Sequence, residues 1–130
     1  MDNRTRTVLI VDDDPQVLHF VQDVLRLAGY NVSTAESGIT ALAMIEEQAP
    51  DLLVLDLVMP DMDGFEVLRA VRNRDANLPI LVTSGFQAGV LLPAASFLGA
   101  TAVIEKPVAP ARFLEIVRKL WVSPASGGTA

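Results

Sequence analysis

Three short apolar segments of this chain each end on charged residues. They are residues 8–11 before Asp12, Asp13 and Asp14, residues 52–55 before Asp56, and residues 102–104 before Glu105 and Lys106. A short, uninterrupted apolar run is typical of a strand that is covered on both faces, as in a parallel sheet. If these strands lie in one parallel sheet, their carboxyl ends meet at one edge, and the acids and the lysine converge there.

The segments between these runs have the periodicity of helices that bury one face. We expect strands at residues 8–11, 31–35, 52–55, 80–83 and 102–104, and helices at about 15–28, 38–48, 87–98 and 110–121, with a further helix after the loop 59–64 that carries Phe65, Leu68 and Val71. Five strands that alternate with five helices predict a doubly wound α/β domain with helices on both faces of a parallel sheet. We therefore expect one domain over residues 1–122 and a disordered tail over residues 123–130.

The composition excludes several classes of function. The chain of 130 residues is 51% hydrophobic and carries a formal net charge of -6, which argues against direct binding to nucleic acid. It has no cysteine, so disulfides and thiolate chemistry are excluded. No segment resembles a signal peptide or a membrane span, and we expect a soluble, cytoplasmic protein.

The convergence of Asp12, Asp13 and Asp56 requires a positive charge, because carboxylates at short range raise one another's pKa. Oxygen donors alone favour Mg²⁺ or Mn²⁺ over zinc. Lys106 would bring a further positive charge, so that three negative charges meet three positive ones. Such a balance suits phosphoryl transfer to a carboxylate.

These residues, together with the pairs around them, resemble the response-regulator receiver domain of two-component signalling over residues 7–121. The matching positions are Val11-Asp12-Asp13, Leu55-Asp56, Met59-Pro60, Asp63-Gly64, Ser84-Gly85 and Lys106-Pro107. The resemblance implies a flavodoxin-like fold with strand order 2-1-3-4-5. It also implies that Asp56 accepts the phosphoryl group, that Asp13 binds Mg²⁺ directly and Asp12 through water, and that Lys106 holds a phosphoryl oxygen. The backbone carbonyl of Val58 would complete the protein's share of the metal ligands.

Two further positions concern the switch that follows phosphorylation. Ser84 lies five residues after Pro79, where the family usually has its switch hydroxyl, and Thr83 should point to the opposite face of the strand. Val103 lies three residues before Lys106, where the family usually has an aromatic residue. The chain departs from the family at this position. Elsewhere, Asp14, Asp51, Asp61 and Asp63 are interpreted as helix caps or turn formers.

The resemblance implies a switch that takes its phosphoryl group from the phosphohistidine of a sensor or hybrid histidine kinase, or of a phosphotransfer protein. It implies at most weak self-catalysed phosphotransfer and dephosphorylation. From residue 76 to residue 104 the chain has no charged residue. We hypothesise that the helix within this stretch exposes an apolar surface, including Leu91 and Leu92, to a downstream partner or a second copy. The alternative is that a broader face of this helix is buried.

Two alternatives remain at this stage. One is a pseudo-receiver that binds partners without phosphorylation, although such modules usually lack one of the acids or the lysine. The other, less favoured, is an aspartyl-phosphate phosphatase of the haloacid-dehalogenase type, which needs an acid two residues after its nucleophile, where this chain has Val58.

Overall fold

All ten expected elements are present in the structure, a computed structural model that describes residues 5–59, 62–85 and 87–127. The strands are β1 (Thr7–Val11), β2 (Asn31–Ala35), β3 (Leu52–Asp56), β4 (Ile80–Ser84) and β5 (Ala102–Glu105). The helices are α1 (Pro15–Leu27), α2 (Gly38–Glu47), α3 (Gly64–Arg74), α4 (Ala88–Phe97) and α5 (Pro110–Gly127). Strands and helices alternate along the chain, so the prediction of a doubly wound α/β fold is confirmed.

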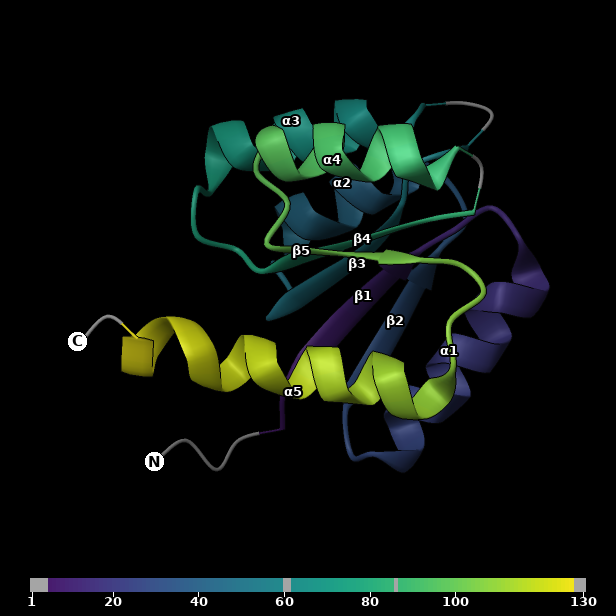
Figure 1. Cartoon of the computed structure of the whole chain (residues 1–130), viewed down its shortest axis with the longest axis vertical. Coiled ribbons are helices and arrows are strands. Elements are labelled where there is room, and N and C mark those ends of the chain that lie inside the picture. The colour runs from purple at the N-terminus through teal and green to yellow at the C-terminus, as the bar shows by residue number, and fades with distance from the viewer. Residues whose placement is uncertain (1–4, 60–61, 86, 128–130) are drawn as a thin grey trace.

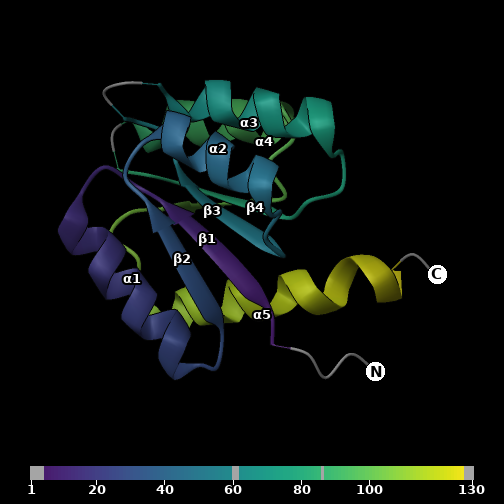
Figure 2. The ribbon, with the colours of Figure 1, turned by 180° about the vertical axis from the view of Figure 1, so that it is seen from behind.

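The five strands form one parallel sheet in the order β2-β1-β3-β4-β5, as predicted. Helices α1 and α5 cover one face of the sheet, and α2, α3 and α4 cover the other (Figures 1 and 2). The carboxyl ends of all strands therefore lie at the same edge. The residues that follow β1, β3 and β5 come together there.

Each face of the sheet has its own apolar core, because side chains alternate along a strand. In β1, Leu9 and Val11 pack with α2, α3 and α4, whereas Val8 and Ile10 pack with α1 and α5. The central strands β1, β3 and β4 are buried on both faces, which explains why their sequences are continuous apolar runs. This double burial fixes the positions of the strand ends.

Side chains cap the N-termini of three helices. Asp14 accepts a hydrogen bond from the Gln16 amide ahead of Pro15, and Ser37 accepts one from the Thr40 amide. Asp63 forms a capping box with Glu66 at the start of α3. The cap assignments of Asp14 and Asp63 are confirmed.

The last helix differs from expectation. It continues to Gly127 instead of ending near Trp121, so part of the expected tail has helical backbone. The chain contains no glycine between Pro110 and Gly127, and glycine is the residue that most often stops a helix. Pro124 removes only one backbone donor from this stretch. Residues 128–130 lie outside the described residues.

Helix α3 approaches the end of β3 closely at Gly64. An added Cβ at this position would lie 2.5 Å from the Leu57 Cα and 2.6 Å from the Asp56 carbonyl oxygen. We expect Gly64→Ala to lower the free energy of unfolding by about 1–3 kcal/mol, because backbone atoms must move apart. Urea denaturation followed by circular dichroism measures this loss.

The control is Gly89→Ala in α4, where an added Cβ would meet nothing within 4 Å. Here we expect the free energy of unfolding to rise by up to about 1 kcal/mol, because alanine is the better helix former. Equal effects of the two substitutions would contradict the close approach at Gly64.

Candidate functional site

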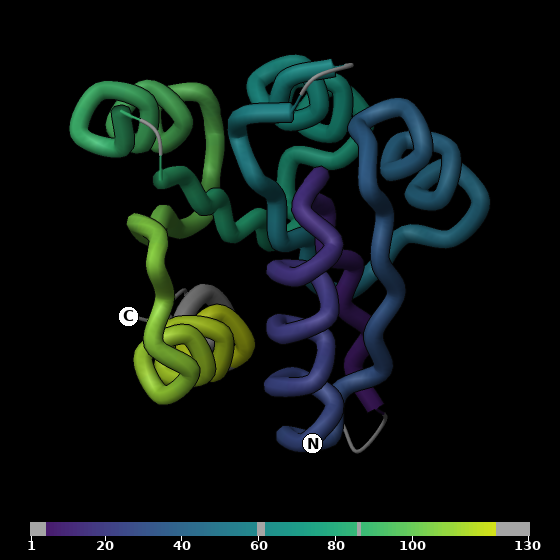
Figure 3. The backbone as a smooth tube through the Cα atoms, turned by 90° about the vertical axis from the view of Figure 1, so that its right-hand side faces the viewer, coloured from purple at the N-terminus to yellow at the C-terminus, as the bar shows by residue number. Residues whose placement is uncertain are grey.

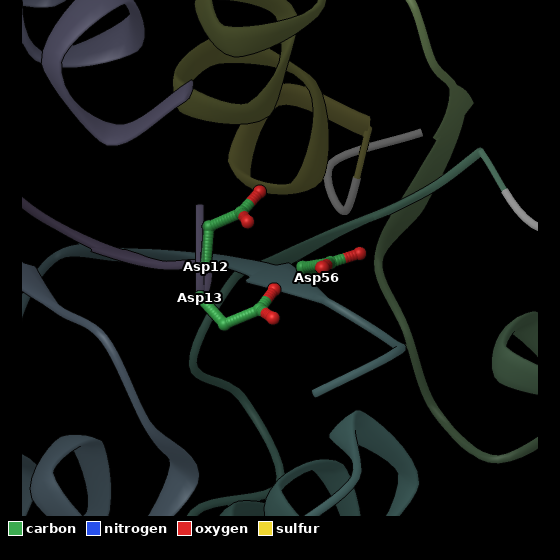
Figure 4. A group of neighbouring side chains, drawn as sticks. All are labelled: Asp12, Asp13 and Asp56. Carbon is green, nitrogen blue, oxygen red and sulfur yellow. The ribbon is translucent and has the colours of Figure 1, made fainter. Parts of the chain in front are cut away.

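Three carboxylates meet at the carboxyl edge of the sheet. Asp12 and Asp13 directly follow β1, and Asp56 ends the neighbouring strand β3, with Val11 and Leu55 paired in register. One oxygen of each carboxylate lies within 4.8 Å of the others, and the three side chains surround a common space (Figure 4). Asp12 and Asp56 are buried, whereas Asp13 is exposed. The predicted convergence is confirmed.

Lys106 reaches the same cluster from the end of β5. Its Nζ donates a hydrogen bond to Asp12 Oδ2 at 2.7 Å and lies 3.6 Å from Asp56 Oδ1. The backbone amide of Lys106 donates to the Ser84 carbonyl, and the Lys106-Pro107 peptide bond is cis. The sequence interpretation gave Lys106 a role toward a phosphoryl oxygen but did not foresee that Asp12 would be its nearest partner. The convergence of unlike charges on one edge was the available signal.

Burial and neighbouring charges alter the ionisation of this cluster. Burial is the largest influence on Asp56, and together with the charge of Asp12 it raises the pKa of Asp56 from 3.8 to about 6. The charge of Lys106 and a hydrogen bond from the Val58 backbone oppose this rise. For Lys106, burial favours the neutral amine, but the hydrogen bond to Asp12 and the charge of Asp56 outweigh it and raise the pKa. The lysine therefore stays protonated.

The donor set fits a hard divalent cation. The cluster offers carboxylate oxygens only, and Mg²⁺ and Mn²⁺ prefer such ligands. A cation here would also oppose the two influences that raise the pKa of Asp56, which are its burial and the negative charge of Asp12. Asp12, Asp13 and Asp56 are the residues that could hold it. The Val58 backbone touches Asp56 through its hydrogen bond, and the predicted role of its carbonyl as a ligand stays a prediction.

Thr83 and Ser84, the two candidate switch hydroxyls, lie on opposite faces of β4. Thr83 lines a cavity on the side of α1 and α5, whereas Ser84 follows Val82, which packs on the side of α2, α3 and α4. Ser84 is fully buried, and its carbonyl is bonded to Lys106. Val103 is half-buried against the core of the α4 side. The expected alternation of Thr83 and Ser84 is confirmed.

Asp51 and Asp61 were also interpreted as structural acids. Asp51 accepts hydrogen bonds from the backbone amide and the hydroxyl of Thr7, and so joins the start of β3 to the start of β1. Asp61 lies outside the described residues. None of the described residues beyond the cluster of Asp12, Asp13 and Asp56 forms a further acidic group with metal-binding spacing.

Comparison with known proteins gives a consistent result. The profile of the family described as "Response regulator receiver domain" matches residues 8–118. Response regulator MprA of Mycobacterium avium is 39% identical over 113 residues, which are 87% of this chain and 50% of MprA. The probable transcriptional regulatory protein TcrX of Mycobacterium tuberculosis is 40% identical over 87 residues, which are 67% of this chain and 37% of TcrX. The chain thus spans half or less of the length of these relatives.

Solved structures share the fold over most of the chain. The chemotaxis response regulator CheY4 of Vibrio cholerae superposes with a TM-score of 0.83 and 32% identity, covering 90% of this chain and 99% of that chain. The receiver domain of NtrX from Brucella abortus superposes with a TM-score of 0.85 and 28% identity, covering 89% of this chain and 98% of that chain. Within the part of the chain that the structure describes, no helix combines the length and the apolar character needed to cross a bilayer.

The raised pKa of Asp56 predicts that removal of its charge stabilises the metal-free protein. Between pH 4 and pH 8 the folded state of the wild type loses stability relative to Asp56→Asn, because the folded state holds the proton of Asp56 more tightly than the unfolded state. The difference should be absent below about pH 4 and reach about 3 kcal/mol at pH 8. Urea denaturation in EDTA at several pH values measures it.

Glu47→Gln, which removes an exposed acid at the end of α2, is the matched control and should follow the wild-type curve. If Asp56→Asn and wild type differ in free energy of unfolding by an amount that does not change with pH, the raised pKa of the Asp56 carboxylate is contradicted.

Proposed function

This chain belongs to the receiver-domain family of response regulators, and from that premise we propose that Asp56 accepts a phosphoryl group from a phosphohistidine in a Mg²⁺-dependent reaction. The observation that supports this most directly is the meeting of Asp12, Asp13, Asp56 and Lys106 from three strands at one edge. Burying three acids and one lysine together destabilises the folded state, unless the group binds a charged ligand. A receiver domain of this family is a signalling switch rather than an enzyme in the usual sense.

The transfer itself needs little from the protein beyond position and charge. A carboxylate oxygen of Asp56 forms a bond to phosphorus while the bond between phosphorus and the imidazole nitrogen breaks. The electron pair of the broken bond stays on that nitrogen, which then takes up a proton. Lys106 lies 3.6 Å from Asp56 Oδ1 and would hold an oxygen of the transferred group. The bound cation would supply the remaining positive charge that the phosphoryl oxygens require.

Asp56 must be ionised to attack phosphorus. Its pKa of about 6 in the metal-free protein leaves most of the carboxylate charged at neutral pH, and the nearby positive charge of Lys106 favours that form. Asp12 holds Lys106 at 2.7 Å and so keeps the ammonium group at the site before the phosphoryl group arrives. Asp12 thereby acts on the reaction both as a metal ligand and as the residue that positions the lysine.

Ser84 would carry the signal away from the site. Its hydroxyl lies on β4, the strand next to β3, on the side of the sheet that α4 covers. A new phosphoryl group on Asp56 would draw this hydroxyl toward it and shift an equilibrium between surface conformations. Val103 has no aromatic ring that could change its rotamer in response to such a movement. The conformational change would therefore be transmitted through the packing between β4, β5 and α4.

We propose the exposed side of α4 as the surface that binds a downstream partner or a second copy. Val90 and Phe97 are 70% and 89% exposed, and this helix has no charged residue. Large apolar side chains exposed in this way mark interaction sites. The expectation for Leu91 and Leu92 needs correction: Leu92 is buried and Leu91 packs against the core, because the helix turns these two residues toward the sheet.

The source of the phosphoryl group is part of the same proposal. Receivers of this family interact with histidine kinases and with downstream effectors, and we propose a sensor or hybrid kinase, or a phosphotransfer protein, as the donor to this chain. A cytoplasmic location belongs to the proposal as well. Because the chain spans only part of its relatives, the effector it controls is not identified by their names.

Phosphorylation is tested by intact-mass spectrometry after incubation with acetyl phosphate and Mg²⁺. We expect the mass of one phosphoryl group to appear on the wild type and to be absent in EDTA and in Asp56→Asn. Asp63→Asn is the matched control, since Asp63 caps α3 and should leave labelling intact. Equal labelling of Asp56→Asn would reject Asp56 as acceptor, and an unlabelled wild type would favour a module that binds partners without phosphorylation.

The α4 surface is tested by Val90→Glu combined with Phe97→Glu. We expect this variant to accept phosphate normally but to lose self-association or partner binding of the phosphorylated protein, measured by light scattering and by affinity for the effector. Leu27→Glu on α1, where the side chain is 91% exposed, controls for the loss of an exposed apolar group. An unchanged association in the α4 variant would contradict the assignment.

A further inference from the structure

Arg72, near the end of α3, joins this helix to the loop that follows α4. Helix α3 lies between α2 and α4 on one face of the sheet (Figure 3). The Arg72 side chain is half-buried, and its Nε donates a hydrogen bond to the Gly99 carbonyl at 2.8 Å. Its Nη2 donates to Thr101 Oγ1 at 3.2 Å, and its Nη1 donates to the Asp75 carbonyl at 3.1 Å. One guanidinium group thus connects residues 75, 99 and 101.

Two further contacts extend this connection. Thr101 Oγ1 also accepts a hydrogen bond from the Ile80 amide at 2.9 Å, so the network reaches the start of β4. Gly99 has a φ of +114°, and an added Cβ there would lie 3.1 Å from Arg72 Nε. The arginine side chain therefore packs directly against the backbone of the loop, at a position where both the conformation and the space favour glycine.

The C-terminal end of α4 is the element that Arg72 holds. It ends in a Schellman motif, in which the Gly99 amide donates to the Ser96 carbonyl and the Ala100 amide donates to the Ala95 carbonyl. Carbonyl groups at the end of a helix carry a partial negative charge that a cation stabilises. The sequence of α4 contains no basic residue, so Arg72 supplies this positive charge from the neighbouring helix.

The N-terminal end of α4 is built differently. Gln87, which precedes the helix, has a left-handed backbone with a φ of 50°, and its side chain makes no capping hydrogen bond within the described part of the chain. Gly89 lies in the first turn, where glycine lowers helix stability. Pro93 removes a backbone donor from the middle of the helix. The first turns of α4 thus lack the support that its last turn receives.

We propose that Arg72 is a positioning residue that fixes the C-terminal end of α4 to α3, so that conformational change of α4 is confined to its first turns. Of the two exposed apolar residues of this helix, Val90 would then change its position and Phe97 would keep it. The anchoring does not depend on phosphorylation. Its effect on the α4 surface rests on the proposed function, and the two parts are therefore tested separately.

The anchoring is tested by ¹⁵N relaxation of the full chain in EDTA without a phosphate donor, because order parameters report motion within the folded state. Arg72→Met keeps a side chain of similar length but removes every donor. We expect the order parameters of residues 98–101 to fall from about 0.85 in the wild type to about 0.6 in this variant. Those of Leu57 and Lys106, at the opposite edge of the sheet, should stay unchanged.

Arg74→Met is the matched control, because Arg74 lies on the same helix, is exposed and is 3.9 Å from Glu46. It should leave residues 98–101 unchanged. Arg72→Lys should give intermediate values, since an ammonium group can reach one acceptor but cannot span all three. Unchanged order parameters at residues 98–101 in Arg72→Met, or an equal fall throughout the chain, would overturn the proposal.

Circular dichroism establishes that the variants fold. If Arg72→Met does not fold, Arg72→Lys and the wild type decide. Lower order parameters at residues 88–92 than at residues 98–101 in the wild type, with a smaller difference in Arg72→Lys, support the anchoring. Equal values at both ends of α4 in the wild type overturn it.

The effect on signalling is tested by ¹⁵N chemical shifts with excess acetyl phosphate and Mg²⁺. We expect the shifts within and after α4 to change at residues 88–92 in the wild type, and to change at residues 98–101 as well in Arg72→Met. Wild-type changes of equal size at both ends would contradict the confinement. Intact-mass spectrometry of the same samples records the phosphoryl group. If none is added, the proposed function has failed, and the relaxation measurements still decide the anchoring.

Discussion

Lys106 and Asp12 approach to 2.7 Å across the carboxyl edge of the sheet, although 94 positions separate them in the chain. This ion pair joins the end of the edge strand β5 to the end of the central strand β1, with β3 and β4 between them. The contact is possible only because both strands are held in one parallel sheet by apolar packing on its two faces. The site thus depends on the fold, and the positions of the strand ends become the positions of the charges.

The same cluster opposes the stability that the apolar cores provide. Asp56 is buried beside Asp12, and the fact that its pKa rises to about 6 means that the ionised form is unfavourable in the folded, metal-free protein. Lys106 relieves only part of this repulsion, because its closest contact is to Asp12 rather than to Asp56. In the proposed function, the unbalanced negative charge would attract a positive ion to this edge and, with it, phosphoryl oxygens. The loss of stability and the proposed function would then have the same physical source.

The periodicity of the sequence was sufficient to predict every strand and helix and, with the resemblance, the strand order. Local signals also identified Asp14 and Asp63 as caps, because capping depends on residues adjacent in sequence. The convergence of Asp12, Asp13, Asp56 and Lys106 followed from strand ends alone. What could not be predicted depends on how side chains pack between elements: the Lys106-Asp12 pairing, the cavity beside Thr83, and the inward orientation of Leu92. No short-range pattern encodes such contacts.

Helix α4 is anchored differently at its two ends. Beyond its C-terminal end, Arg72 of α3 donates a hydrogen bond to the Gly99 carbonyl and another to Thr101, which is itself bonded to the Ile80 amide. At its N-terminal end, three residues after Ser84, Gln87 has a left-handed backbone conformation and no side-chain cap, in contrast to the capped starts of α1, α2 and α3. Pro93 removes a further backbone donor within the helix. A displacement of Ser84 would therefore meet least resistance at the start of α4, which would pivot about the end fixed by Arg72 and carry Val90 farther than Phe97. In the proposed switch, this difference in anchoring would give the site a physical route to the exposed apolar surface of α4 without an aromatic residue in place of Val103.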